Sequence, residues 1–235
     1  MFKIKMAELV IEIDNKYDFI KKQCKNYICE SNESDLTISV NRKEIQKEAN
    51  GTWFYNKGYC ESLAVYRKIA LKLPLYDGML FHGAAVALDG EAYLFLAKSG
   101  TGKTTHVSLW KKVFGERAEI INGDKPIVRK INSIWQVCGT PWCGKEGFSS
   151  NKTVPLKAIC FLERGTENEI KPIEISEITK NLFNRLLIPK DKESSDSFFE
   201  LINNLIDNIS FYHLKCNMEA DAAVISYNGM KDRFV

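Results

Sequence analysis

Hydrophobic positions in the first third of the chain follow two different periods. Apolar residues alternate or run continuously over Leu9–Asp14 and Leu36–Asn41, which predicts two strands. Asn50-Gly51 predicts the turn of a hairpin between Lys47-Glu48 and Trp53–Tyr55. From Tyr59 to Leu73 the apolar residues fall on one helical face, and Pro74 ends the predicted helix.

The rest of the chain mixes strand and helix patterns. Met79–Leu88 and Ala92–Ala97, joined by the turn Asp89-Gly90, predict a hairpin. Further strands are expected over Ala118–Ile121, Ile127–Lys130, Ile134–Val137 and Leu156–Leu162. Helices are expected over His106–Phe114, Ile178–Leu187 and Ser197–Ile206. A charged loop runs from Pro189 to Ser195, and the segments Phe211–Cys216 and Ala222–Tyr227 close the chain. This order predicts an α/β fold with a mixed β-sheet core over 76–235 and a small strand-rich α+β portion over 1–75.

Composition narrows the class of protein. The chain has 235 residues, 45% of them hydrophobic, and a net charge of +3, which predicts a globular protein and argues against nucleic acid as a partner. No signal-peptide pattern and no apolar run of about 20 residues is present in the sequence, so we expect no membrane association and a cytoplasmic location. The seven cysteines include no Cys-x-x-Cys pair, which favours reduced thiols over a metal site.

The segment Ala97–Thr105 carries the strongest chemical signal. It follows a predicted strand, precedes a predicted helix, and contains the run Ser99-Gly100-Thr101-Gly102-Lys103-Thr104-Thr105. Glycines at this junction let backbone N–H groups converge on an anion, so all seven residues are candidates for binding nucleotide phosphates. Lys103 can reach the terminal phosphates, and the Thr104 hydroxyl can ligate Mg²⁺. Ala97 stands where the usual pattern has its first glycine.

Three further places are candidates for chemistry. Asp124 follows the strand Ala118–Ile121, where a metal-ligating carboxylate belongs, although a turn aspartate after Asn-Gly would look the same. His82 precedes the hairpin strand and could equally be a hydrogen-bonded core histidine. The loop Gly139–Gly147 contains Lys145 and Glu146, which it could present to the site or merely carry on a structural turn.

Together these residues resemble a known family. Phe81-His82-Gly83, the hairpin, Ser99–Thr105 and the acidic strand end look like the catalytic core of HPr kinase/phosphorylase and share the phosphate loop of ATP-dependent phosphoenolpyruvate carboxykinase. The HPr-kinase-like proteins of peptide-modification clusters are similar as well. The resemblance spans roughly residues 79–165. It implies the carboxykinase type of P-loop fold, ATP and Mg²⁺ as cofactors, and compatibility with a homo-oligomer.

The resemblance also implies roles for single residues. Lys103 would bind the β- and γ-phosphates, Thr104 and Asp124 would hold Mg²⁺, and His82 would lie beside the transferred phosphate. The related enzymes have two adjacent acids where this sequence has Gly123-Asp124. Asp124 therefore serves both metal and acceptor, or a base comes from elsewhere, or no transfer occurs.

The sequence thus predicts an ATP- and Mg²⁺-dependent phosphotransferase acting on a hydroxyl of a small molecule, peptide or protein. The alternative is a nucleotide-binding regulatory or accessory protein without phosphoryl transfer. Lys145 would neutralise charge on the phosphoryl group and Glu146 would assist Asp124. We expect Arg164 and Arg185 to be solvated surface residues, and the 1–75 portion to serve substrate recognition or dimerisation.

Overall fold

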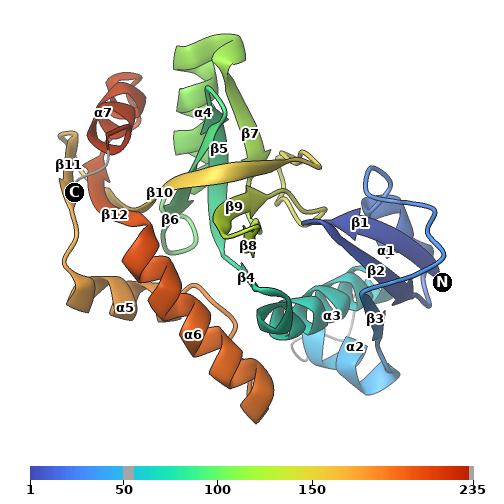
Figure 1. Ribbon diagram of the computed structural model, residues 1–235. Helices are drawn as coiled ribbons and strands as arrows, with labels where there is room; N and C mark the ends of the chain where they lie inside the picture. Colours follow the sequence, from blue (N-terminus) through green and yellow to red (C-terminus); the bar gives the residue numbers. More distant parts are fainter. Residues whose placement is uncertain (50–55, 233–235) are drawn as a thin grey trace.

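A computed structural model describes residues 1–49 and 56–232. The N-terminal part contains a three-stranded sheet in the order β1-β2-β3, with β1 antiparallel and β3 parallel to β2. Helices α1, α2 and α3 lie beside this sheet (Figure 1). The elements are β1 (Phe2–Met6), β2 (Leu9–Asp14), α1 (Asp18–Gln23), β3 (Leu36–Ser39), α2 (Arg42–Glu48) and α3 (Lys57–Lys72), followed by the 3₁₀ helix η1 (Leu73–Tyr76).

The larger part is built on a nine-stranded mixed sheet. Seven strands follow the order β4-β8-β9-β10-β6-β5-β7, and β12 pairs with β10 and with β11. The strand β10 begins antiparallel to β9 and continues parallel to both β6 and β12. The strands are β4 (Gly78–Leu80), β5 (Gly83–Leu88), β6 (Glu91–Leu96), β7 (Ala118–Asn122), β8 (Ile127–Ile131), β9 (Ile134–Cys138), β10 (Thr153–Arg164), β11 (Glu169–Pro172) and β12 (Ser210–Cys216).

Helices cover both faces of this sheet. Along β6, Tyr93 and Phe95 face a core that includes Trp110, whereas Leu94 and Leu96 face a core that includes Phe198. This period of two, with both faces apolar, explains why β6 reads as an uninterrupted hydrophobic run. The first core lies under α4 (Lys103–Phe114) and α7 (Asp221–Met230), and the second lies under α5 (Ile175–Phe183) and α6 (Lys192–Asn208). The short 3₁₀ helix η2 (Gly115–Arg117) links α4 to β7.

The two parts share a third hydrophobic core. Trp142 and Leu80 of the larger part pack in one cluster with residues of the three-stranded sheet and α3, among them Ile11 and Val65. Arg129 donates a hydrogen bond from its Nη1 to the Ala7 carbonyl across the same junction, at 2.7 Å. The three-stranded unit is therefore packed against the larger sheet by buried apolar surface and by hydrogen bonds (Figure 1).

Several sequence predictions need correction. The expected hairpin arm at Lys47-Glu48 is wrong, because these two residues form the end of helix α2. The remainder of the predicted hairpin lies outside the described residues. The predicted strand Met79–Leu88 is two strands, β4 and β5, separated by Phe81 and His82. Helix α5 overlaps the predicted range, but both of its ends lie several residues earlier than predicted. Helix α6 begins at Lys192, inside the predicted charged loop.

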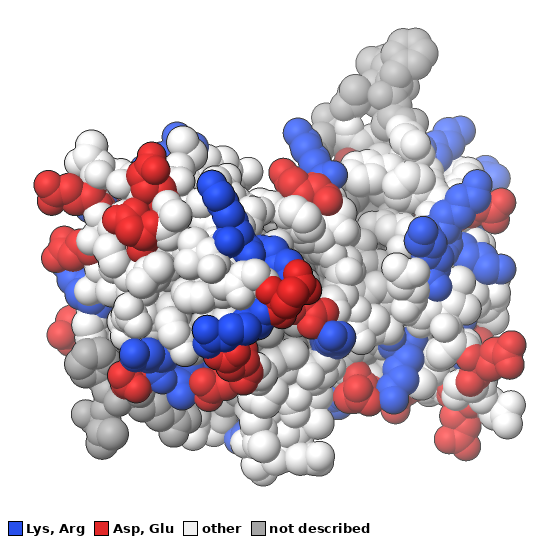
Figure 2. Space-filling view, turned by 90° about the horizontal axis from the view of Figure 1, so that it is seen from above, with Lys and Arg blue, Asp and Glu red and all other residues white. Residues whose placement is uncertain are grey.

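The surface carries charges of both signs. On the face seen in Figure 2, basic and acidic side chains are interspersed over the whole outline. Within residues 1–49 and 56–232, no helix has the length and apolar character that crossing a membrane requires.

Candidate functional site

The glycine-rich segment lies between a buried strand and a helix, as predicted. β6 ends at Leu96, and α4 begins at Lys103, with Gly102 at the N-cap. Gly100 and Gly102 have φ angles of +79° and +118°. These are values that residues with a β-carbon rarely adopt, so the turn needs glycine at both positions. The first amides of α4 have no acceptor within the helix and are directed out of its N-terminus.

Lys103 is buried inside this loop. Its side chain is 7% exposed, and its Nζ donates to the carbonyl of Ala97 at 3.2 Å. Burial lowers the pKa of Lys103, and the negative charge of Asp124 opposes that shift. Among the described residues, the ammonium group has one carbonyl partner, and it lies within the electrostatic reach of Asp124.

Asn122 sets the turn that presents Asp124. Its buried side-chain Oδ1 accepts hydrogen bonds from the backbone N–H groups of Asp124 and Lys125, at 2.8 and 2.7 Å. Its Nδ2 donates to the Thr140 carbonyl at 3.0 Å. The sequence analysis did not single out Asn122, although its place between an apolar strand and Gly-Asp is the usual place for such an Asx turn.

The Asp124 carboxylate contacts one cationic side chain and one side chain that is cationic when protonated. His82 Nε2 lies 3.2 Å from Oδ1, and Lys125 Nζ lies 3.2 Å from Oδ2. Burial by itself would raise the pKa of Asp124, but the hydrogen bond from His82 and the charge of Lys125 outweigh it, so the pKa lies below its ordinary value. Asp124 is therefore an ionised carboxylate at neutral pH.

The backbone brings these groups next to the glycine-rich loop. The Thr104 hydroxyl donates to the carbonyl of Gly123 at 3.4 Å, so it lies one residue from Asp124. The amide of Gly83 donates to the Asp124 carbonyl at 3.0 Å, which places His82 beside the same turn. The candidates Lys103, Thr104, His82 and Asp124 are thus brought together from three separate segments.

The loop 139–147 packs over Asp124. A β-carbon on Gly144 would lie 3.2 Å from the Asp124 Cβ, and one on Gly123 would lie 2.9 Å from the Cys143 carbonyl oxygen. Lys145 lines a cavity together with Asp124 and Lys125. Glu146 is exposed, and within the described part of the chain no hydrogen bond or ion pair joins it to Asp124. The structure thus brings Lys145 to the site and leaves Glu146 at its margin.

Two arginines, expected as solvated surface residues, also lie beside the glycine-rich loop. Arg164, although exposed, donates from Nε to the Thr101 carbonyl at 3.1 Å and from Nη2 to the Gly100 carbonyl. Arg185 is half-buried, its Nε has no partner among the described residues, and its charge contributes to the lowered pKa of Lys103. Neither neighbour could be inferred from sequence spacing, because Arg164, at the end of β10, and Arg185, just beyond the end of α5, are each more than 60 residues from Gly100 and Thr101.

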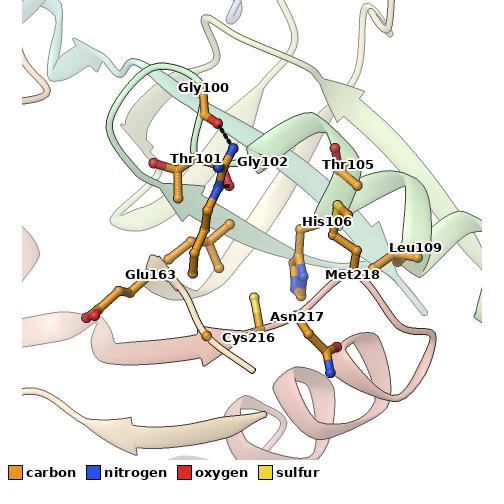
Figure 3. Close-up of a pocket in the computed structure, with 13 residues that line it drawn as sticks. Gly100, Thr101, Gly102, Thr105, His106, Leu109, Glu163, Cys216, Asn217 and Met218 are labelled. Atoms are coloured by element: carbon orange, nitrogen blue, oxygen red, sulfur yellow. Dashed lines mark hydrogen bonds between the residues drawn. The ribbon is translucent and has the colours of Figure 1, made fainter. Parts of the chain in front are cut away.

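Two of the cavities that border the site differ in size and in lining. One, of about 400 Å³, lies between α4 and the end of β12, with Gly100–Gly102 at its rim and Leu109, Cys216 and Met218 among its lining residues (Figure 3). The other, of about 830 Å³, opens at Asp124 and extends to α1 and α3. Among the described residues, no cluster of three or more His, Cys, Asp or Glu side chains could hold a metal by itself.

The fold and site define a mixed α/β protein with a glycine-rich loop between strand and helix and an Asp–His pair beside it. The family model described as SynChlorMet cassette protein ScmC matches residues 59–221, which is more than half of the chain, and the chain belongs to this family. A search of curated proteins gives no match.

The solved structures include a distant likeness. The HPr(Ser) kinase/phosphatase of Coxiella burnetii aligns with 54% of this chain and 89% of its own, at 11% identity and a TM-score of 0.31. The predicted roles of the site residues, the nucleotide and the metal stay predictions.

Proposed function

We propose that this protein is an ATP- and Mg²⁺-dependent phosphotransferase that acts on a hydroxyl group. The observation that carries the proposal is the convergence of a buried lysine and an ionised carboxylate at one loop. Lys103 lies inside the glycine-rich turn, and the Thr104 hydroxyl bonds to the residue that precedes Asp124. Phosphoryl transfer needs these two things together, a cradle for the phosphates and an acid at their far end.

The loop supplies the phosphate cradle. Free N–H groups at the start of α4 favour negative charge, and the helix dipole adds to that preference. Lys103 would exchange its weak contact with the Ala97 carbonyl for the β- and γ-phosphates, and that exchange would compensate for the cost of burying its charge. Arg185 stands close enough to add a second positive charge.

Thr104 and Asp124 suit a magnesium ion delivered with the nucleotide. Mg²⁺ commonly takes only one or two protein oxygens and completes its shell with phosphates and water, so a three-carboxylate cluster is not required. The ionised Asp124 and the neighbouring Thr104 hydroxyl are such a pair of oxygens. The ion would neutralise charge on the phosphates.

The cavity of about 400 Å³ beside the loop suits the nucleoside. Its wall combines apolar side chains, Leu109, Leu162 and Met218, with backbone of the loop itself. A planar base prefers such an apolar surface with few polar groups. Figure 3 shows Leu109 of α4, Cys216, Asn217 and Met218 among the side chains around this cavity.

In the transfer itself, the acceptor oxygen forms a bond to the γ-phosphorus while the bond from that phosphorus to the β–γ bridging oxygen breaks, and ADP leaves. Asp124 orients the acceptor hydroxyl and receives its proton, with His82 holding the carboxylate in place through its 3.2 Å contact. A carboxylate of low pKa suffices because the transition state of phosphoryl transfer is loose. Lys125 would face the developing negative charge, and Lys145 would face the acceptor.

The alternative function is a nucleotide-binding regulatory or accessory protein without transfer. One observation favours it: Gly123 replaces the second acid, and the carbonyl of Cys143 fills the space that a side chain there would need. Such a protein would bind ATP through the same loop and consume none.

Titration of ATP–Mg²⁺ and incubation with γ-labelled ATP and a cell extract separate the two functions. For the phosphotransferase, we expect label in an acceptor. Lys103→Ala should lose nucleotide binding, and Asp124→Asn should keep binding but lose labelling. Lys112→Ala, an exposed lysine on the same helix, is the matched control and should behave as the parent protein. Tight binding without labelled product would establish the alternative, and absence of nucleotide binding would refute both.

A further inference from the structure

The cavity that opens at Asp124 lies at the junction of the two parts of the molecule. Its volume is about 830 Å³, within the range of small-molecule sites. Asp124, Lys125 and the segment Pro141–Lys145 form one wall, and residues of α1 and α3 form the other. A molecule bound here would touch the proposed transfer site at one end and the N-terminal part at the other.

Aromatic side chains dominate the wall away from Asp124. Tyr66 packs against Trp142 with ring centroids 5.7 Å apart, and Phe19 packs edge-on against Tyr59 at 5.9 Å. Phe19 and Tyr59 are 38% and 50% exposed, so a large part of each aromatic ring faces solvent. An apolar or aromatic ligand would cover them.

Hydrogen bonds fix this wall in position. Trp142 Nε1 donates to the Ser62 hydroxyl at 2.9 Å, Ser62 donates to Gln23 Oε1 at 2.5 Å, and Gln23 Nε2 donates to the Pro141 carbonyl at 3.0 Å. The chain ties α1 and α3 to the loop that covers Asp124. A surface ordered in this way loses little conformational freedom when a ligand binds.

The cavity has an excess of positive charge. Lys22, Lys125 and Lys145 line it, and among the described residues Asp124 is the only carboxylate that does so. Lys125 pairs with Asp124, whereas among the described residues Lys22 and Lys145 have no ion-pair partner. A ligand that carries one negative charge would match the two unpaired ammonium groups.

The Tyr66 hydroxyl is a further polar group of the cavity. Burial raises the pKa of Tyr66, and the charge of Asp124 raises it further, so the hydroxyl stays protonated and can donate a hydrogen bond. No described residue accepts that bond, which leaves it for an oxygen of the ligand.

We propose that the phosphoryl acceptor is a small hydroxy acid with an aromatic or bulky apolar group, bound in this cavity with its hydroxyl at Asp124. Its carboxylate would face Lys22 and Lys145, and its apolar group would lie against Tyr59, Tyr66 and Trp142. This inference rests on the proposed phosphotransferase function and adds the class of substrate to it.

Ligand-observed NMR titration of the full chain, with ATP–Mg²⁺ binding measured separately, tests the inference. The probes are 3-phenyllactate, its neutral amide and lactate. We expect 3-phenyllactate to bind more tightly than the other two, because only it combines the aromatic group with the charge. The double variant Lys22→Gln/Lys145→Gln should weaken the acid about fivefold and leave the amide unchanged, as expected for partly screened ion pairs.

Two matched variants complete the experiment. Tyr59→Ala should weaken the acid and the amide alike, and Lys21→Gln, an exposed neighbour of Lys22 that does not line the cavity, should change neither. Equal binding of acid and amide, an unaffected double variant, or no binding of any probe would overturn the inference. If ATP still binds in those cases, the proposed function survives; loss of ATP binding in the parent protein would instead refute the function.

Discussion

The carbonyl oxygen of Cys143 lies 2.9 Å from the position that a β-carbon would take on Gly123. Real β-carbons do not approach an oxygen so closely, and a backbone atom cannot swing aside as a flexible side chain does. The glycine next to Asp124 is thus required by the loop that covers it, and adding a second acid at this position would displace that loop.

Gly123→Asp should therefore destabilise the protein rather than restore a second acid. We expect a loss of about 2 kcal/mol in the free energy of unfolding, typical of overpacking in a tight site. Denaturant unfolding followed by tryptophan fluorescence measures it. Gly78→Ala is the control, because a β-carbon there meets its nearest atom at 3.4 Å. Equal stability of the two variants would show that the 139–147 loop yields easily.

Arg164→Met should loosen the glycine-rich loop. The guanidinium group holds the carbonyls of Gly100 and Thr101, and without it the loop amides spend less time in the geometry that binds phosphate. We expect a roughly tenfold weaker affinity for ATP, the loss of one or two charge-assisted hydrogen bonds. Isothermal titration measures it, and faster hydrogen exchange at residues 100–102 should accompany it. Arg117→Met, which removes a remote surface ion pair with Asp89, should leave both unchanged.

His106 should make the protein sensitive to acid. Its ring is buried, and burial lowers the pKa of His106 from 6.5 to about 4. Between about pH 4 and pH 6.5, His106 is protonated in the unfolded chain but not in the folded chain. The free energy of unfolding therefore falls by up to about 3 kcal/mol as the pH drops across this range. His106→Gln, which keeps an acceptor for Trp110 Nε1, should flatten this dependence. Urea midpoints at pH 7 and pH 4.5 measure it, and an equally steep loss in the variant would contradict the assignment.

Ser62→Ala should weaken the junction between the two parts of the molecule. The change leaves Trp142 Nε1 without its buried acceptor, which costs about 1–3 kcal/mol. Thermal unfolding should show the loss in the whole protein, because the junction and the N-terminal sheet share one core. Thr179→Ala, on the exposed side of α5, is the matched hydroxyl deletion and should have a small effect.

The local parts of this structure could be predicted from the sequence. The strand–loop–helix unit around Lys103 has apolar residues with a clear period and glycines at the turn, so its place in the fold follows from short-range chemistry. The division of Met79–Leu88 into β4 and β5 could not be predicted, since every residue but His82 in that run is buried and no change in pattern marks the break. Helix α2 was missed because Ile45 is its one buried residue.

In the candidate site, too, some features follow from the local sequence and others only from the assembled fold. Its glycine-rich loop is a continuous segment. His82 and Asp124 lie 3.2 Å apart, and Thr104 of the loop bonds to the residue before Asp124, while the roles expected for these residues stay predictions. Arg185 was misjudged because its position depends on an isolated pairing of Phe81 with Leu186, a contact between residues more than 100 positions apart. Sequence spacing carries no information on such a contact, and only the assembled fold brings it about.

The core shared by the two parts sets a limit on how this chain can be shortened. Leu80, Ile127, Cys138 and Trp142 belong to the larger part, yet they are buried against the three-stranded sheet and α3. A protein beginning at residue 76 would expose these side chains to water as one contiguous apolar patch, and such patches promote self-association. Removing the N-terminal part would therefore yield an aggregating protein rather than a smaller folded one, and the loop over Asp124 would lose its support at the same time.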